Sequence, residues 1–255
     1  MLFRSYAVGH DEDGDGRDDG CDNCPTYDNA WQLDDDMDGD GYGVPGTGLG
    51  NECEAPFDEG MLSGYSVFDA MTSPSNAWTT SDDTEWTWGA DELVGSSPSD
   101  GANMYHSTQH GSGPYSVETV FDIVPDVTNQ NEKYSCVLFA VQSSSSNGTF
   151  WECCYEWDSR ALSVWRFNGY WIELVGEVDD VDTSSPDASI WRRVRVYHDG
   201  GDQLVCTFEN ETDEVGTSAT YTVPTNQLPD DLGGHGGLRV YNSTTAFRSY
   251  MIYTD

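Results

Sequence analysis

The sequence predicts a mainly β protein, in which a small aspartate-rich loop module precedes an antiparallel β-sandwich. From about residue 60 onward, short alternating segments are separated by Gly, Ser, Asn and Asp turns, and no convincing amphipathic helix interrupts them. About ten strands in roughly 140 residues are typical of a sandwich. The expected strands are Ser116–Val124, Tyr134–Gln142, Thr149–Trp157, Leu162–Phe167, Trp171–Gly176, Ile190–His198, Gln203–Glu209, Ala219–Val223, Gly237–Tyr241 and Ala246–Tyr253.

The first of these strands shows the alternation clearly. Val117, Phe121 and Ile123 share one face with Thr119, whereas Glu118, Val120 and Asp122 take the other. Successive side chains of a strand point to opposite sides of the sheet. We therefore expect one buried and one wetter side here.

The segment from Asp11 to Cys53 spaces its carboxylates for Ca²⁺. The segment has aspartates at alternate positions, then a glycine and a further aspartate, which are positions 1, 3, 5, 6 and 9 of a calcium loop. A calcium loop needs this spacing because Ca²⁺ takes six to eight oxygen ligands, and the glycine permits the sharp turn that brings them together. The pattern recurs once, although no flanking helices and no Glu at position 12 accompany it. The first set is Asp11, Asp13, Asp15 and Asp19 around Gly16, and the second is Asp34, Asp36, Asp38 and Asp40 around Gly39.

The alternative for this segment is a solvated acidic linker, since Asp- and Gly-rich runs are usually disordered. The repeated register and the surrounding cysteines favour metal binding. The segment has few apolar residues with which to form a core, and its carboxylates repel one another until cations neutralise them. We therefore expect its order to depend on metal. The apolar residues are Trp31, Leu33, Met37, Tyr42 and Val44.

The run Cys21-Asp22-Asn23-Cys24-Pro25, followed by Asn29, Gln32 and the Asp34/Asp36/Asp38/Gly39/Gly41 series, resembles a thrombospondin type 3 repeat. The resemblance implies a Cys24–Cys53 disulfide. An insertion of about nine residues near Tyr42 to Gly50 displaces the acidic residue expected after Gly41, and Asn51 or Glu52 is expected to replace it. Cys21 is then the odd cysteine, because the repeat that it would close is absent. The expected divisions are a lead segment over 1–10, the calcium module over 11–55 and the sandwich over 60–255.

Charge and cysteine content restrict the partners and the compartment. A net charge of −36 excludes nucleic acid and makes anionic membrane surfaces unfavourable. Seven cysteines beside an extracellular type of calcium loop indicate an oxidising compartment. No run of 18 apolar residues occurs, so membrane insertion is not expected. The first ten residues do not form a signal peptide, and we expect a mature or truncated chain.

Four landmarks resemble the concanavalin A-like or laminin G-like jelly roll. They are the segments YSVETVF, FWECCYEW, WRRVRVYHDG and GGLRVYNSTTAFRSYMIY, in that order. The thrombospondin family also places such a sandwich after its calcium repeats, so the two resemblances agree.

Four cysteines lie in predicted strands. Cys153 and Cys154 are neighbours and must face opposite sides of the sheet. Two bridges among these two residues, Cys136 and Cys206 are expected, with the pairing left open, and free buried thiols are the alternative.

Catalysis is not expected. Glycosidases of the jelly-roll type carry Glu-x-Asp-x-x-Glu on a central strand, and this chain has Glu156 and Asp158 but Ala161 at the third position. Alanine cannot supply the proton that the leaving group needs. His106 and His110 are four residues apart, but their surroundings predict a loop or strand end rather than a zinc-binding helix.

Nine tryptophans suggest carbohydrate binding, because flat rings can stack on sugars. Trp151, Tyr155 and Trp157 share a strand face and are the candidate glycan contacts, although core packing is the favoured alternative for these rings. Trp191 is expected in the core.

Together these features predict an extracellular, calcium-binding, non-enzymatic protein of the cell surface that serves adhesion or structure. Its expected partners are glycans or matrix components. The alternatives are a subunit of a self-assembling filament and a glycan hydrolase of the concanavalin A-like fold.

Overall fold

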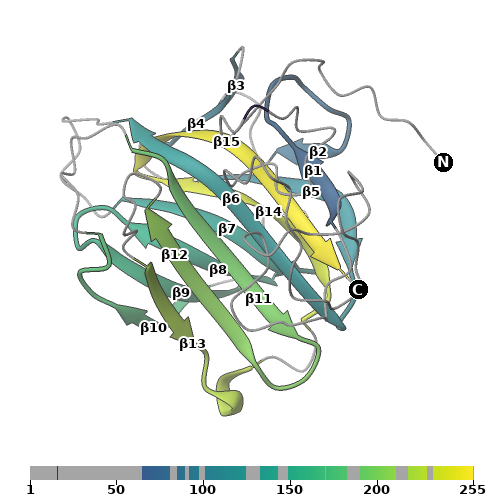
Figure 1. Cartoon of the computed structure of the whole chain (residues 1–255), viewed down its shortest axis with the longest axis vertical. Helices are drawn as coiled ribbons and strands as arrows, with labels where there is room; N and C mark the ends of the chain where they lie inside the picture. The colour runs from purple at the N-terminus through teal and green to yellow at the C-terminus, as the bar shows by residue number, and fades with distance from the viewer. Residues whose placement is uncertain are drawn as a thin grey trace.

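The computed structural model describes Gly16 and residues 65–80, 85–89, 92–97, 101–124, 133–142, 149–169, 171–182, 190–210, 218–228 and 232–254. Apart from one 3₁₀ turn, Thr225–Gln227, the regular elements within these ranges are strands. They form two antiparallel sheets packed face to face, which confirms the predicted β-sandwich (Figure 1). None of the described helical turns is long and apolar enough to cross a bilayer.

The first sheet has eight strands. Seven of them follow one another in the order β13 (Ser218–Thr222), β12 (Leu204–Asn210), β11 (Arg192–Asp199), β6 (Pro114–Val124), β15 (Ser243–Thr254), β4 (Leu93–Ser97) and β3 (Trp86–Trp88), and the eighth pairs with β15 alone. β15 pairs with β6 on one side, and on its other side it pairs first with β4 and then with β1 (Tyr65–Asp69). The first described strand therefore lies beside the last one, with Tyr65 opposite Tyr253.

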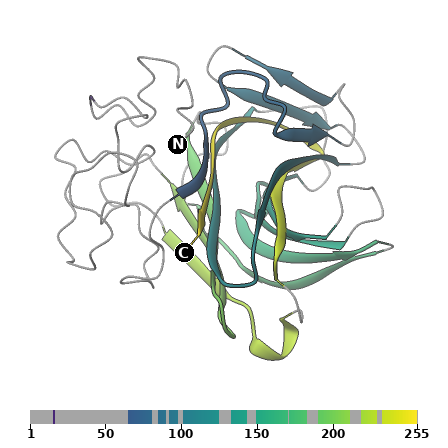
Figure 2. The same cartoon turned by 90° about the vertical axis from the view of Figure 1, so that its right-hand side faces the viewer.

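The second sheet has seven strands and forms the other layer in the turned view (Figure 2). Their spatial order is β10 (Ile172–Val178), β9 (Ala161–Asn168), β8 (Thr149–Glu156), β7 (Tyr134–Val141), β14 (Gly234–Tyr241), β5 (Ala102–His110) and β2 (Trp78–Thr80). β10 is an edge strand and is connected to β13 of the other sheet by a hydrogen bond from the Tyr221 hydroxyl to the Val175 carbonyl, 3.3 Å long.

All ten predicted strands are present, with ends that shift by a few residues. The five strands before residue 111 were not predicted. Two of these, β2 and β3, are only three residues long, which is too short for an alternating pattern to be recognised. His106 lies within β5 and His110 is its last residue, so His110 stands at the expected strand end and neither histidine lies on a helix. Both imidazoles are buried among aromatic rings, His106 against Trp78 and His110 against Tyr115.

The core lies between the sheets and is crossed by one disulfide. Tyr155 on β8 stacks on Phe208 on β12 with 4.9 Å between ring centroids, and the Cys153–Cys206 bridge joins the same two strands. The neighbouring Cys154 points away from the core and bridges to Cys136 on β7. The expectation of two bridges, with Cys153 and Cys154 on opposite faces, is confirmed. Trp191 differs from expectation, since it is partly exposed and packs under Arg248.

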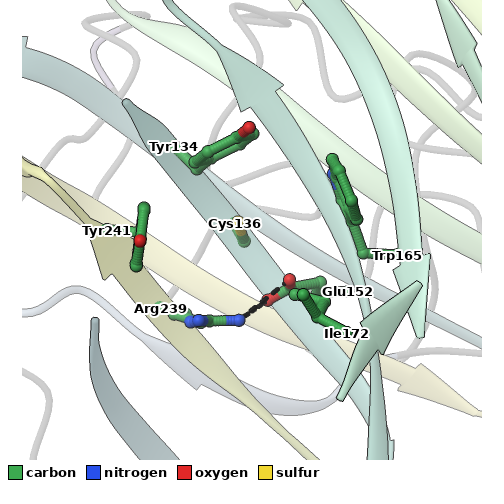
Figure 3. A pocket seen from close by; sticks show the side chains of 7 residues that line it. All are labelled: Tyr134, Cys136, Glu152, Trp165, Ile172, Arg239 and Tyr241. Atoms are coloured by element: carbon green, nitrogen blue, oxygen red, sulfur yellow. Dashed lines mark hydrogen bonds and ion pairs between the residues drawn. The ribbon is translucent and has the colours of Figure 1, made fainter. Parts of the chain in front are cut away.

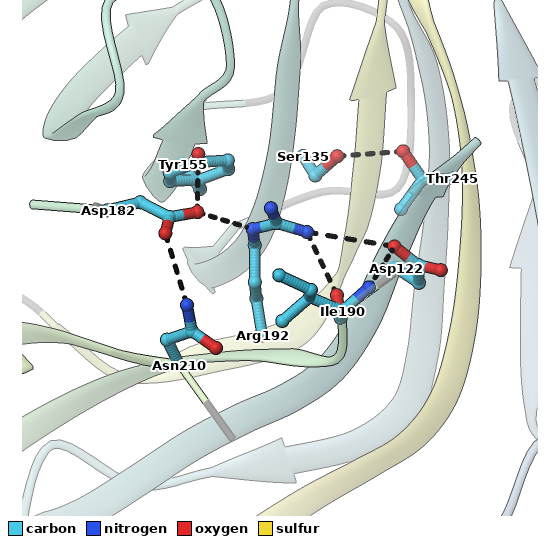
Figure 4. A network of polar contacts seen from close by, with 8 residues as sticks. All are labelled: Asp122, Ser135, Tyr155, Asp182, Ile190, Arg192, Asn210 and Thr245. Carbon is cyan, nitrogen blue, oxygen red and sulfur yellow. Dashed lines mark hydrogen bonds and ion pairs between the residues drawn. The ribbon is translucent and has the colours of Figure 1, made fainter. Parts of the chain in front are cut away.

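A buried polar network ties the chain segment after β10 to both sheets (Figure 4). Arg192 donates to Asp182 over 2.8 Å and lies 3.6 Å from Asp122. Asp182 also accepts hydrogen bonds from the Tyr155 hydroxyl and the Asn210 amide. Buried charges need such partners, because an unpaired one would lose its hydration without compensation. The network therefore holds Asp182, just after β10, against Arg192 on the central strand β11.

The two faces of β6 do not behave as the alternation predicts. Val117, Phe121 and Ile123 face the core, as expected. However, Glu118 and Val120 on the other side are only 0% and 1% exposed. The prediction of a wetter outer side is therefore wrong for this part of the strand.

Candidate functional site

A pocket of about 270 Å³ lies on the outer face of the seven-stranded sheet (Figure 3). It spans neighbouring strands from the edge strand β10 to β14. Its lining combines aromatic rings, one ion pair and one disulfide. The lining residues are Tyr134, Cys136, Glu152, Trp165, Ile172, Arg239 and Tyr241.

Strand alternation places these side chains. On β8, Trp151 and Tyr155 point into the core, so Glu152 between them points outward. On β14, Leu238 and Val240 are core residues, which turns Arg239 outward. The antiparallel pairings bring these positions together from distant parts of the sequence.

An ion pair forms one wall of the pocket. The Nη1 atom of Arg239 lies 2.9 Å and 2.8 Å from the two carboxylate oxygens of Glu152. The Glu152 side chain is buried, and the Arg239 guanidinium also lies over the rings of Phe150 and Tyr241. Charge-assisted hydrogen bonds of this kind are short and directional. The pair is therefore held in one geometry before any ligand arrives.

A glycine makes room for the guanidinium. Gly101 has a positive φ of 80°, and a Cβ atom there would lie 3.1 Å from two nitrogens of Arg239. A larger residue at this position would be strained and would displace the arginine. The loop before β5 thus helps to place the charged wall.

Aromatic rings form the opposite part of the rim. The Tyr134 ring meets Trp165 edge to face at 5.9 Å and lies 5.8 Å from Tyr241. The indole N–H of Trp165 donates to the Ser163 hydroxyl over 2.8 Å, which fixes the ring's orientation. At the edge of the sheet, Ile172 is 45% exposed and extends the apolar surface. Apolar walls with a few fixed polar groups are typical of sites for small molecules.

The pocket lacks the paired acids of a glycosidase. Glu152 is the one carboxylate among the lining residues, and it is occupied by Arg239. Glu156 and Asp158 lie outside the pocket, and Glu156 accepts a hydrogen bond from Ser159 at the β8–β9 turn. Slight burial, together with repulsion from Asp179 and Glu156, raises the pKa of Glu177 on this exposed edge. The lining therefore offers binding groups rather than an acid–base pair.

The three candidate glycan contacts lie in the core. Trp151, Tyr155 and Trp157 are 4%, 1% and 8% exposed. These rings fill the space between the sheets, because large apolar rings bury the most surface there. The core-packing alternative therefore describes them, and they do not form an exposed platform.

The predicted calcium ligands lie outside the described residues, as do Cys24, Cys53 and Cys21. These residues include Asp11, Asp13, Asp15, Asp19, Asp34, Asp36, Asp38, Asp40, Asn51 and Glu52. Gly16, which is described, has a positive φ of 89°, a backbone conformation that glycine adopts readily. In the described part of the chain, one group has metal-ligand spacing, namely Cys136, Glu152 and Cys154. Its two sulfurs form a disulfide and cannot act as thiolates, so this group does not fit a metal.

Sequence reasoning missed the residues that line the pocket. The alternation in FWECCYEW puts Glu152 on the face opposite Trp151 and Tyr155, and this is the signal that could have found it. Arg239 lies 87 residues away from Glu152, and the sequence carries no signal for that pairing.

The fold is shared with carbohydrate-binding proteins of known structure. A carbohydrate binding module, CBM66 from Bacillus subtilis, superposes with a TM-score of 0.53 at 16% identity, covering 70% of this chain and 96% of the module. The Emp47p carbohydrate recognition domain superposes with a TM-score of 0.55 at 13% sequence identity, covering 77% of this chain and 98% of that domain. The exoplasmic/lumenal domain of VIP36, in a form bound to Ca²⁺ and Man3GlcNAc, superposes with a TM-score of 0.53 at 7% sequence identity. This match covers 74% of this chain and 90% of that domain.

No protein-family model and no curated protein matches the sequence. The resemblance to a thrombospondin repeat therefore stays a prediction. At these identities the likeness to solved structures shows the fold alone, which is a β-sandwich of the jelly-roll kind that the landmarks of the strands predicted.

Proposed function

We propose that this protein binds neutral carbohydrates in the outer-face pocket of the seven-stranded sheet and does not hydrolyse them. The observation that carries the proposal is the buried Glu152–Arg239 pair set against the exposed edges of Trp165 and Tyr134. The fold of several carbohydrate-recognition domains supports it.

The two kinds of wall match the two surfaces of a sugar ring. The C–H face of the ring packs against the indole of Trp165 and the phenol ring of Tyr134. Neighbouring hydroxyls donate to the Glu152 carboxylate and accept from the Arg239 guanidinium. Because these groups are already fixed, binding costs little side-chain ordering. A pocket of about 270 Å³ lies just below the usual range for drug-sized ligands, which suits one sugar residue at a time.

Charge selects neutral sugars. The positive charge of Arg239 is balanced by Glu152, and the whole chain carries a net charge of −36. Acidic sugars would therefore meet a repulsive field with no unbalanced cation in the pocket to offset it.

The pocket is best tested with a glycan array, followed by calorimetric titration of the strongest neutral oligosaccharide. Trp165→Ala should weaken binding at least tenfold, which is about 1.4 kcal/mol. Trp191→Ala is the matched control, since Trp191 is also partly exposed but packs under Arg248 away from the pocket. Equal binding by both variants, or binding of acidic glycans alone, would refute the proposal.

We place this activity in an extracellular, calcium-dependent protein of the cell surface that serves adhesion or structure. Two disulfides in the sandwich are consistent with an oxidising compartment. The spacing of aspartates in residues 11–40 supports calcium binding, at the roughly 10⁻⁴–10⁻³ M concentrations of extracellular sites. A full chain that binds no calcium in equilibrium dialysis at millimolar concentration would contradict this.

A further inference from the structure

The central part of the outer face of the eight-stranded sheet, over β6, β11 and β15, is buried, although it should be solvated in a two-layer sandwich. Alternation turns its side chains away from the core, because the neighbouring residues on the same strands belong to the core cluster. Yet each is at most 4% exposed. We call this set the covered face: Val120 on β6, Arg193, Arg195 and Tyr197 on β11, and Met251 and Tyr253 on β15.

The charges on the covered face are those of an interior. Glu118 lies among these residues, fully buried, with Arg195 at 2.5 Å and Arg193 at 3.8 Å. The second arginine also reaches the half-exposed Glu209, at 3.5 Å. Long charged side chains on a solvated sheet face normally keep their charged ends in water. Their burial indicates that another part of a protein lies over them.

We propose that the covered face is the docking surface for the aspartate-rich N-terminal segment, residues 11–55 of the same chain. The first argument is the place where that segment joins the sandwich. It precedes β1, whose first residue, Tyr65, pairs with Tyr253 of the covered face. The chain thus enters the sandwich beside the surface in question.

The second argument is length. The covered face extends over three neighbouring strands, about 10 Å across, and over several residues along each strand. The other undescribed stretches hold eight residues or fewer. The 64 positions before Tyr65 provide enough chain to cover it.

The third argument is complementarity. Residues 11–55 contain fifteen acidic side chains and one basic one, Arg17, whereas the covered face presents two arginines, which contact Glu118 and the half-exposed Glu209. The segment also carries a few apolar side chains, among them Trp31, Leu33 and Met37, that are too few to form their own core. Val120, Met251 and Tyr253 offer the apolar partner surface. The covered face thus offers guanidinium groups and an apolar surface to an acidic segment that has too few apolar residues for its own core.

A site-specific photocrosslink in the full chain tests the occupant. Tyr197 is replaced by p-benzoylphenylalanine, and the matched control carries the same probe at Tyr134, on the outer face of the other sheet. On irradiation, the probe at position 197 should crosslink to peptides within residues 11–55, and the probe at 134 should not. Crosslinks from position 197 to other regions only would overturn the proposal. So would crosslinks to a second copy, which a mixture of isotopically light and heavy chains reveals.

The unsubstituted protein gives a second measurement. If the face is covered, peroxide should oxidise Met251 at least tenfold more slowly than it oxidises the same methionine in a denatured chain. Oxidation at the same rate in both states would show that the face is open and would overturn the proposal even if the probe at 197 impaired folding. Neither experiment depends on glycan binding, so the two proposals can fail separately.

Discussion

The two outer faces of the sandwich carry similar residues in different surroundings. Each has an ion pair between a buried glutamate and an arginine on a neighbouring or nearby strand, Glu152–Arg239 on one face and Glu118–Arg195 on the other. Around the first pair, the rings of Tyr134, Trp165 and Tyr241 leave a hollow. Around the second, the side chains are almost wholly buried. The comparison teaches that the same kind of buried pair occurs in two settings, one beside a hollow and one beneath other side chains.

The largest expected effect comes from breaking the pair on the covered face. Arg195→Met should lower the free energy of unfolding by about 3–5 kcal/mol, because Glu118 would stay buried without its closest cation. The matched control is Arg166→Met, whose pair with Glu173 is 40% and 51% exposed and should contribute below about 1 kcal/mol. Urea denaturation of both variants measures the difference. Similar losses in the two variants would mean that water reaches the covered face.

The two disulfides separate stability from binding. Replacing both Cys153 and Cys206 by serine should lower the free energy of unfolding by about 4 kcal/mol, because this bridge closes a loop of 53 residues. Replacing both Cys136 and Cys154 should lower it by about 3 kcal/mol, because their loop spans 18 residues. Only the second change touches the pocket, which Cys136 lines. Unfolding measurements together with glycan titration should therefore show weaker binding for that variant alone. A loss of binding confined to the Cys153/Cys206 variant would place the ligand elsewhere.

Calcium removal should have the smallest effect on stability. At tenfold above its dissociation constant, each ion contributes only about 1.4 kcal/mol. We expect chelation to leave the far-UV β signal intact while the N-terminal segment becomes sensitive to protease. Hydrogen exchange should then rise in β6, β11 and β15 but stay unchanged in β7, β8 and β14. Uniform exchange across both sheets would show that the faces do not respond separately.

Alternation within a strand was readable from the sequence, and contacts between distant strands were not. The segment FWECCYEW gave its two faces correctly, including the opposite orientations of Cys153 and Cys154. The pattern alone does not say which face holds the site, and the flat rings of Trp151 and Tyr155 favoured the face that the structure places in the core. The size of the side chains decides which face is buried, since the space between the sheets takes the largest rings.

The covered face was mispredicted for a related reason. In Ser116–Val124, Glu118 and Asp122 indicate a solvated side by composition. Arg195 lies 77 residues beyond Glu118, and only the pairing of β11 with β6 brings them together. Short strands such as Trp86–Trp88 were missed because three residues cannot show a period of two. Local pattern thus predicted the architecture, whereas the polar pairs depend on sheet register.

The pairing of Tyr65 with Tyr253 has a consequence for how the molecule is oriented. It puts both backbone exits of the sandwich at one place on the eight-stranded layer, whereas the hollow with Trp165 opens on the opposite layer. Anchorage through either exit would turn the hollow outward, toward an approaching surface. The pairing of β1 with β15 would thereby determine the side from which the pocket is open to a ligand.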